Sequence, residues 1–250
     1  MLSEPEVLAL VDARHDDPFA VLGLHRDGEG ALWVRAMLPQ AHEVTMHEAT
    51  GGTRVARLAL RHPRGLWEAC VPRRRHRFDY RLQVSWSDGT QGRYADAYAF
   101  GLALAEHALE PFRSGQSPKP WSLMGAAPME MEGVAGVRFA LWAPEAAHAS
   151  VIGGFNGWDV LRHPMRYRYP SGVWEIFVPH AAAGDLYKFS LVGPDGRRLP
   201  EQPDPCARAA EGGPGGASRV ASPPDGPARL PAAGSPSQNG VAFDTQEQTR

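Results

Sequence analysis

The sequence predicts an all-β protein with two tandem immunoglobulin-like β-sandwiches followed by a disordered C-terminal tail. Three observations lead to this prediction. Short segments of alternating apolar and polar residues are separated by Gly, Pro and Asn turns. The same series of segments occurs twice. Beyond residue 205 the chain is rich in Pro and Gly and loses its hydrophobic periodicity. We therefore divide the chain into a first module (1–100), a connector (101–132), a second module (133–205) and a tail (206–250).

The first module begins with a predicted short helix over residues 3–13. Ser3 is a good N-cap, and Glu6 stands three positions later, as in a capping box. Five strands are then expected, at residues 32–38, 43–48, 53–60, 66–71 and 78–86. The connector contains a candidate helix at 103–109 and a Ser/Pro-rich linker at 114–120.

The second module has four expected strands, at residues 137–141, 149–153, 174–178 and 186–192. After the second of them comes Phe155-Asn156-Gly157-Trp158, where the Asn-Gly pair predicts a turn with positive φ. Trp142 and Trp174 lie within strand periodicity and are expected in the core. Trp158 follows the turn and precedes an aspartate, where a core indole is less natural.

The two modules are related by one constant offset. Trp174 follows Trp67 by 107 residues, and the same interval separates Tyr187 from Tyr80 and Asp195 from Asp88. Such a repeat predicts two copies of one fold. The copies differ at one turn, since the first module has Thr50-Gly51-Gly52 where the second has the tryptophan turn. This difference makes the tryptophan turn a candidate for a function that only the second module has.

Composition excludes several functional classes. The net charge of −2 offers no attraction for nucleic acid or an anionic membrane. The N-terminus has no basic segment followed by an apolar run, and no stretch is long enough to span a membrane. Two cysteines, Cys70 and Cys206, indicate a reducing compartment, so a cytoplasmic protein is expected. Scattered histidines and the lack of a phosphate-binding loop predict no metal and no cofactor.

Three residues are candidates for contact with a sugar. An indole held at a turn, as at Trp158, suits the C–H face of a sugar ring, with polar groups nearby for the hydroxyls. Lys188 alternates with Tyr187 and Phe189 and therefore lies on the other face of its strand. Asn156 is a weaker candidate for the hydroxyls. The alternatives are a loop plug for Trp158 and a solvated strand residue for Lys188.

Two motifs give the chain a family resemblance. The segments GVRFALWAP, SVIGGFNGWD, SGVWEIFVP and LYKFSLVGPDG resemble the carbohydrate-binding module that precedes the catalytic barrel of bacterial 1,4-α-glucan (glycogen) branching enzymes. Upstream, HDDPF followed by VLGLH resembles the opening of the same enzymes. The resemblance implies binding of an α-glucan such as glycogen, and transfer of 1,4-linked glucan to 1,6 branches by the whole enzyme.

The resemblance provides no catalytic residue in this chain. Branching with retention needs a carboxylate nucleophile and a carboxyl acid/base, which the family carries on a (β/α)₈ barrel of at least ~200 residues. No part of the sequence after residue 205 has a βα pattern. We therefore expect the chain to be inactive alone, with any catalytic barrel on another chain. A free-standing glycogen-binding or interaction protein is the alternative, and modules that only pack against a barrel are a third possibility.

Overall fold

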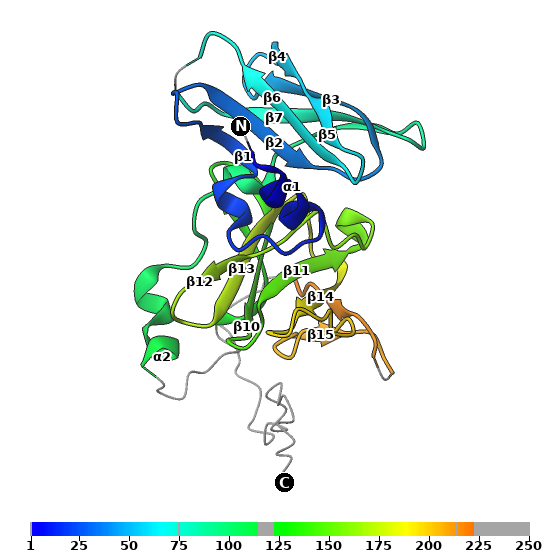
Figure 1. Cartoon of the computed structure of the whole chain (residues 1–250). Coiled ribbons are helices and arrows are strands. Elements are labelled where there is room, and N and C mark those ends of the chain that lie inside the picture. Colours follow the sequence, from blue (N-terminus) through cyan, green and yellow to red (C-terminus); the bar gives the residue numbers. More distant parts are fainter. Residues whose placement is uncertain (1, 75, 115–122, 214, 223–250) are drawn as a thin grey trace.

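The computed structural model describes residues 2–74, 76–114, 123–213 and 215–222. Its first module is a β-sandwich, shown in blue and cyan in Figure 1. One sheet has the order β1-β2-β6-β5 and the other β4-β3-β7-β8, with antiparallel neighbours throughout. The strands are β1 (Gly23–Arg26), β2 (Leu32–Met37), β3 (Ala41–Glu48), β4 (Arg54–Arg57), β5 (Ala59–His62), β6 (Leu66–Val71), β7 (Tyr80–Trp86) and β8 (Gln91–Tyr94).

The second module is a sandwich of the same kind. Its sheets have the orders β12-β13-β10-β9 and β11-β14-β16-β15. The strands are β9 (Gly125–Met131), β10 (Val134–Trp142), β11 (His148–Gly153), β12 (Arg166–Arg168), β13 (Val173–Pro179), β14 (Leu186–Val192), β15 (Ala209–Ala210) and β16 (Ser218–Arg219). The all-β class and the two tandem sandwiches are thereby confirmed.

The repeat is visible in matched hydrogen bonds. The indole Nε1 of Trp67 donates to the carbonyl of Leu38 at 3.2 Å, and that of Trp174 donates to the carbonyl of Ala143 at 3.1 Å. Trp67 lies on β6, which pairs with β2, and Trp174 lies on β13, which pairs with β10. Each indole bonds to the residue that directly follows the partner strand. The two copies therefore share side-chain anchors as well as strand order.

Helical segments are short and lie between or beside the sheets. They are α1 (Glu4–Val11), α2 (Glu110–Arg113) and the 3₁₀ helices η1 (Pro18–Ala20), η2 (Ala97–Ala99), η3 (Glu106–Leu109) and η4 (Gly154–Asn156). The predicted capping box is present, since the Ser3 side chain accepts from the Glu6 amide and the Glu6 carboxylate accepts from the Ser3 amide. Helix α1 lies between the two sandwiches (Figure 1).

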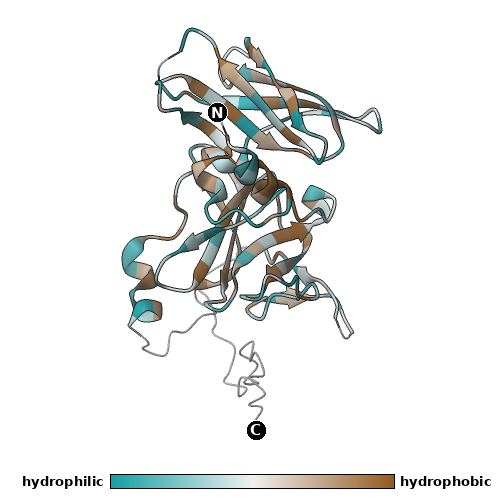
Figure 2. Cartoon of the chain, in the orientation of Figure 1, coloured by the Kyte–Doolittle hydropathy of each residue, from teal (hydrophilic) through white to brown (hydrophobic). Residues whose placement is uncertain are grey.

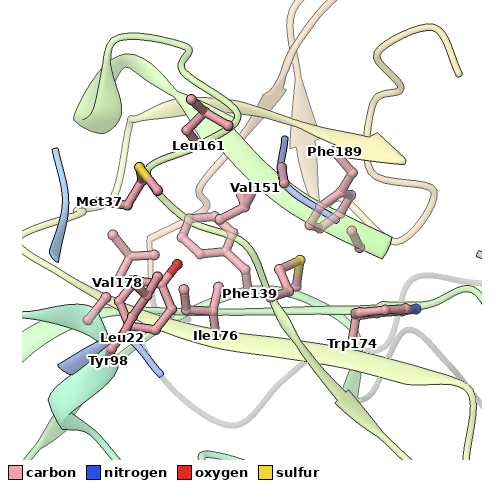
Figure 3. Close-up of a cluster of buried hydrophobic side chains, with 14 of the residues drawn as sticks. Leu22, Met37, Tyr98, Phe139, Val151, Leu161, Trp174, Ile176, Val178 and Phe189 are labelled. Atoms are coloured by element: carbon pink, nitrogen blue, oxygen red, sulfur yellow. The ribbon is translucent and has the colours of Figure 1, made fainter. Parts of the chain in front are cut away.

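The core of the second sandwich continues into the space between the modules. Phe139, Val151 and Phe189 fill the centre, and they belong to one buried cluster with α1 and with Met37 of the first module. Figure 3 shows Met37, Leu22 and Tyr98 beside side chains of the second sandwich, and Figure 2 shows hydrophobic segments on α1 and on the strands around it. A shared core of this kind fixes one module against the other.

The HDDPF segment serves this junction. The Asp17 carboxylate caps η1 by accepting from the Phe19 amide at 3.1 Å. The Phe19 ring packs edge-on against Tyr98 at 4.8 Å, and the Arg166 guanidinium of the second module lies 3.8 Å from the centre of the same ring. The motif therefore acts as a structural contact between modules, consistent with a cation–π interaction at a partly buried site.

The connector covers the outer face of the sheet that contains β13. Glu175 is 2% exposed, and its Oε2 accepts from the Leu104 amide at 2.8 Å. Arg168 pairs with Glu175 and also donates to the Leu104 carbonyl at 2.9 Å. The backbone N–H and C=O of Leu104 are thus both held by a buried ion pair, and these bonds satisfy the charges that the sheet buries.

Several predicted boundaries differ from the structure. The single strand expected at 53–60 is two strands, β4 and β5, because buried Leu58 lies where the chain crosses from one sheet to the other. The expected connector also contains β9, which pairs with β10 along its whole length. Its residues alternate weakly in polarity, and their pairing partner is set by the tertiary fold.

The prediction of disorder was wrong for residues 206–213 and 215–222. β16 pairs with β14 and β15 pairs with β16, Ser218 is fully buried, and Val220 is 1% exposed. Composition alone suggested a tail. In the fold, however, β16 pairs with the free edge of β14, and Ala217, Ser218 and Val220 are buried there. The remainder of the predicted tail, residues 214 and 223–250, lies outside the described residues.

Candidate functional site

The turn after β11 is held by the side chain of Asn156. Its Oδ1 accepts from the Gly153 amide at 2.9 Å, and its Nδ2 donates to the Val151 carbonyl at 2.9 Å and lies 2.9 Å from Nδ1 of His163. The residue is 1% exposed. The expectation that Asn156 contacts sugar hydroxyls therefore requires correction, because its polar atoms are buried and engaged within the turn.

His163 completes this support as a neutral ring. Because the amide nitrogen of Asn156 can only donate, Nδ1 of His163 accepts, and the ring proton belongs on Nε2. Burial, with a smaller contribution from the charge of Arg162, lowers the pKa of His163 to about 3. The turn thus depends on a histidine that stays uncharged at neutral pH.

Trp158 is the large side chain that this turn presents at the surface. Gly157 and Trp158 have φ of 65° and 60°, and the Trp158 amide donates to the Gly153 carbonyl at 2.9 Å. A bulky residue in the left-handed region is a local strain that surrounding bonds must hold in place. The indole is 40% exposed. Its position on a braced turn, with much of its surface open, is the geometry that a stacking platform needs.

Lys188 lies on β14 beside the same turn. The register places Lys188 opposite Ile152 and Tyr187 opposite Gly153. The carbonyl of Gly153 is the one that accepts the hydrogen bond from the Trp158 amide. Tyr187 and Phe189 are 0% and 1% exposed and face the core, so Lys188 projects from the outer face, where it is half-buried. The structure therefore brings Trp158 and Lys188 to the same end of the β11–β14 pair.

The other tryptophan at the surface of this module was expected in the core. Trp142 ends β10 and is 41% exposed, with its Nε1 donating to the Ser171 carbonyl at 3.2 Å. A short connection leads from it to the start of β11, whereas Trp158 follows the end of β11. The two exposed indoles thus lie at opposite ends of the second sandwich.

A cleft between the modules adjoins the tryptophan turn. It has a volume of about 260 Å³, and its walls come from the β7–β8 turn of the first module and from the turn region of the second. Gly157 and Asp159, the neighbours of Trp158 in the chain, both line it. Sequence analysis missed this cleft, since it exists only through the packing of one module on the other.

The described residues give no sign of a metal centre or of a membrane span. No three His, Cys, Asp or Glu side chains gather as ligands within the described ranges. In the same part of the chain, no helix is long and apolar enough to cross a membrane.

A β-sandwich that holds an exposed indole on a braced turn has the architecture of a carbohydrate-binding module. The comparisons with known proteins agree. Residues 123–207 match the family of carbohydrate-binding module 48 (isoamylase N-terminal domain), and residues 3–98 match the N-terminal domain of α-1,4-glucan branching enzyme GlgB. Over these residues the chain thus consists of a domain of the GlgB N-terminal family followed by a module of the carbohydrate-binding module 48 family.

Individual relatives extend the similarity over most of the chain. The 1,4-α-glucan branching enzyme GlgB of Cupriavidus necator is 48% identical over 231 residues, which cover 90% of this chain and 30% of that protein. GlgB of Burkholderia pseudomallei is 48% identical over 86% of this chain and 29% of that protein, and GlgB 2 of Rhizobium etli is 46% identical over the same shares. The chain spans about 30% of the length of these relatives.

Solved structures show a weaker similarity. Pullulanase type I from Bacillus subtilis in complex with maltose matches 84% of this chain and 28% of its own, with 17% identity and a TM-score of 0.34. The assignment therefore rests on the sequence matches and on the geometry of the fold.

Proposed function

We propose that this chain binds α-glucan through Trp158 and Lys188 of its second module. The observation that supports this most directly is the braced indole. Asn156 and His163 hold a strained turn whose large surface residue, Trp158, is 40% exposed. The left-handed backbone conformation of Trp158 has a conformational cost. A ligand that stacks on the indole explains why this strained conformation is retained.

The chemistry of a glucan matches the two residues. The apolar C–H face of a glucose ring stacks on an indole, and an ammonium group donates hydrogen bonds to ring hydroxyls. Lys188 has no ion-pair partner among the described residues, so its three donors are available. Trp158 is 40% exposed, so a polymer that passes over the surface can stack on its indole.

Affinity electrophoresis in native gels with and without glycogen tests the proposal. The wild-type chain is expected to be retarded by glycogen, and Trp158→Ala is expected to abolish the retardation. Trp142→Ala is the matched control, because this indole belongs to the same module and is equally exposed, yet lies at the other end of the sandwich. Absence of retardation of the wild type over a wide range of glycogen concentrations would overturn the proposal.

We further propose that the bound glucan takes part in 1,4-α-glucan branching, the activity in the names of the relatives. Retention in such a transfer needs two carboxyl groups about 5–5.5 Å apart. The carboxylates buried in the described residues have other partners: Asp96 with Tyr80, Asp204 with Tyr187 and Glu175 with Arg168. We therefore expect the modules alone to leave the iodine staining of amylose unchanged, and a change with the pure chain would contradict this. A free-standing glycogen-binding protein is the alternative, and it predicts the same retardation.

A further inference from the structure

We propose that the glucan site extends from Trp158 into the cleft between the modules, so that the first module contributes directly to recognition of longer glucans. This inference rests on the proposed function and adds a second part to the same site. The first observation is the position of Trp158 in the chain. Gly157 and Asp159, on either side of Trp158 in the chain, line the cleft, whereas Trp158 itself does not, so a glucan stacked on the indole enters the cleft by passing over this turn.

The opposite wall belongs to the first module. It consists of the turn after β7, with Trp86, Ser87, Asp88 and Thr90 lining the cleft. Asp88 and Thr90 are exposed, and Asp88 Oδ1 already accepts from the Thr90 amide at 2.8 Å and from its hydroxyl at 2.7 Å. The second carboxylate oxygen of Asp88 has no partner among the described residues, so it is free to accept from a sugar hydroxyl.

The two walls are held at a constant separation. The Arg162 guanidinium of the second module lies 4.6 Å from the centre of the Trp86 ring of the first, where a cation–π interaction joins them. Both groups also line the cleft. Since the modules share a core as well, the cleft is formed before a ligand arrives, and binding there pays little for ordering.

The composition of the cleft identifies its ligand. The cleft is lined by the carboxylates of Asp88 and Asp159, the guanidinium of Arg162 and the hydroxyls of Ser87 and Thr90, around the half-buried indole of Trp86. Neither positive nor negative side chains are clustered in it. Such groups hydrogen-bond to the hydroxyls of a neutral, polyhydroxylated ligand, whereas an anionic ligand would meet Asp88 and Asp159. With about 260 Å³, just below the usual ~300–1,000 Å³ of small-molecule pockets, the cleft suits one or two rings of a longer chain.

The repeat supplies a matched control for the test. Asp195 occupies in the second module the position that Asp88 has in the first, 107 residues later. Each carboxylate accepts from the amide two residues on, at 2.8 Å in Asp88 and 3.0 Å in Asp195, and both are exposed. Asp195 does not line the cleft. Truncation of either residue removes the same turn contact, but only one truncation alters the cleft.

The experiment is isothermal titration calorimetry of the full chain with maltotriose and with maltoheptaose. The wild type is expected to bind maltoheptaose more tightly. Asp88→Ala is expected to weaken maltoheptaose binding about fivefold, the effect of one lost hydrogen bond, with maltotriose unchanged. Asp195→Ala is expected to match the wild type with both sugars. Thr90→Val, which removes only a hydroxyl from the same wall, is expected to act in the same direction as Asp88→Ala.

Two results would overturn the inference, and they differ in what else they affect. If Asp88→Ala and Thr90→Val bind both sugars as the wild type does, while Trp158→Ala binds neither, the cleft takes no part and the proposed function stands. If the wild type binds neither sugar, the proposed function fails and the extension of the site fails with it.

Discussion

The hydroxyl of Tyr187 donates to the carboxylate of Asp204 at 2.5 Å, and both residues are buried in the second sandwich. Tyr80 makes the same bond to Asp96 in the first, at 2.6 Å. Burial raises the pKa of both carboxyl groups, and each tyrosine hydroxyl offsets part of that cost. In each copy the bond joins the strand that carries the tyrosine, β7 or β14, to a chain segment 16 or 17 residues further on. In the second copy that segment leads to β15 and β16.

Tyr187→Phe should therefore destabilise the protein by about 1–3 kcal/mol, because a buried carboxyl group loses its donor. Tyr80→Phe should cost a similar amount through the equivalent bond. Urea denaturation measures both. The variants should differ in where the structure loosens, since only Tyr187→Phe is expected to speed hydrogen exchange over residues 204–220. A cost below ~0.5 kcal/mol in both variants would show that these bonds do not stabilise the two copies.

The strands that carry a clear alternation could be predicted from the sequence. The segments around Trp67 and Trp174 could be placed from their alternation of residue types, although every residue of β13 is buried because the connector covers its outer face. The repeat was equally accessible, since it needs only a constant offset. The resemblance to branching enzymes was confirmed by the two family matches.

Features that depend on tertiary packing could not be predicted in this way. β16 has two residues, and its place in the sheet depends on the free edge of β14 rather than on its own propensity. The position of Asn156 in the turn was foreseen, but an Asn-Gly pair contains no information about which groups the amide will bond. The inter-module cleft has no signature in either module, because its walls meet only in the folded chain.

Asn156→Ala tests whether the turn must be braced for glucan binding. The substitution leaves the buried Gly153 amide and Val151 carbonyl without this partner, so a loss of about 2–4 kcal/mol in unfolding free energy is expected. Retardation by glycogen should fall as well, although Asn156 itself is buried. Unfolding in urea and native electrophoresis measure the two effects. Full retention of binding in a destabilised variant would show that Trp158 needs no such support.

The stability of the protein should fall in acid because of His163. Its pKa is about 3 in the folded chain against the ordinary 6.5, so the unfolded state binds the proton first as pH falls. The stabilisation is complete above pH 6.5 and decreases by ~1.4 kcal/mol per pH unit below it, until the folded pKa is reached.

His163→Gln isolates this effect, because an amide can accept from Asn156 without titrating. Urea midpoints at pH 7 and pH 5 should fall further apart in the wild type than in the variant, by the equivalent of about 2 kcal/mol. Other histidines with lowered pKa, such as His25 and His148, contribute equally to both proteins and cancel in the comparison. Identical pH dependence in the two proteins would contradict a neutral, buried His163.

Lys188→Ala should weaken glucan binding without changing stability. The side chain lies on the outer face of β14, so its removal should alter the unfolding free energy by no more than ~0.5 kcal/mol. Loss of a charged donor to sugar hydroxyls should lower the affinity for maltoheptaose about tenfold, as measured by calorimetry. Arg81, which holds the equivalent position in the first module, is the control, and Arg81→Ala should bind as the wild type does. Equal losses in the two variants would mean that general positive charge, rather than the position of Lys188 beside Trp158, governs binding.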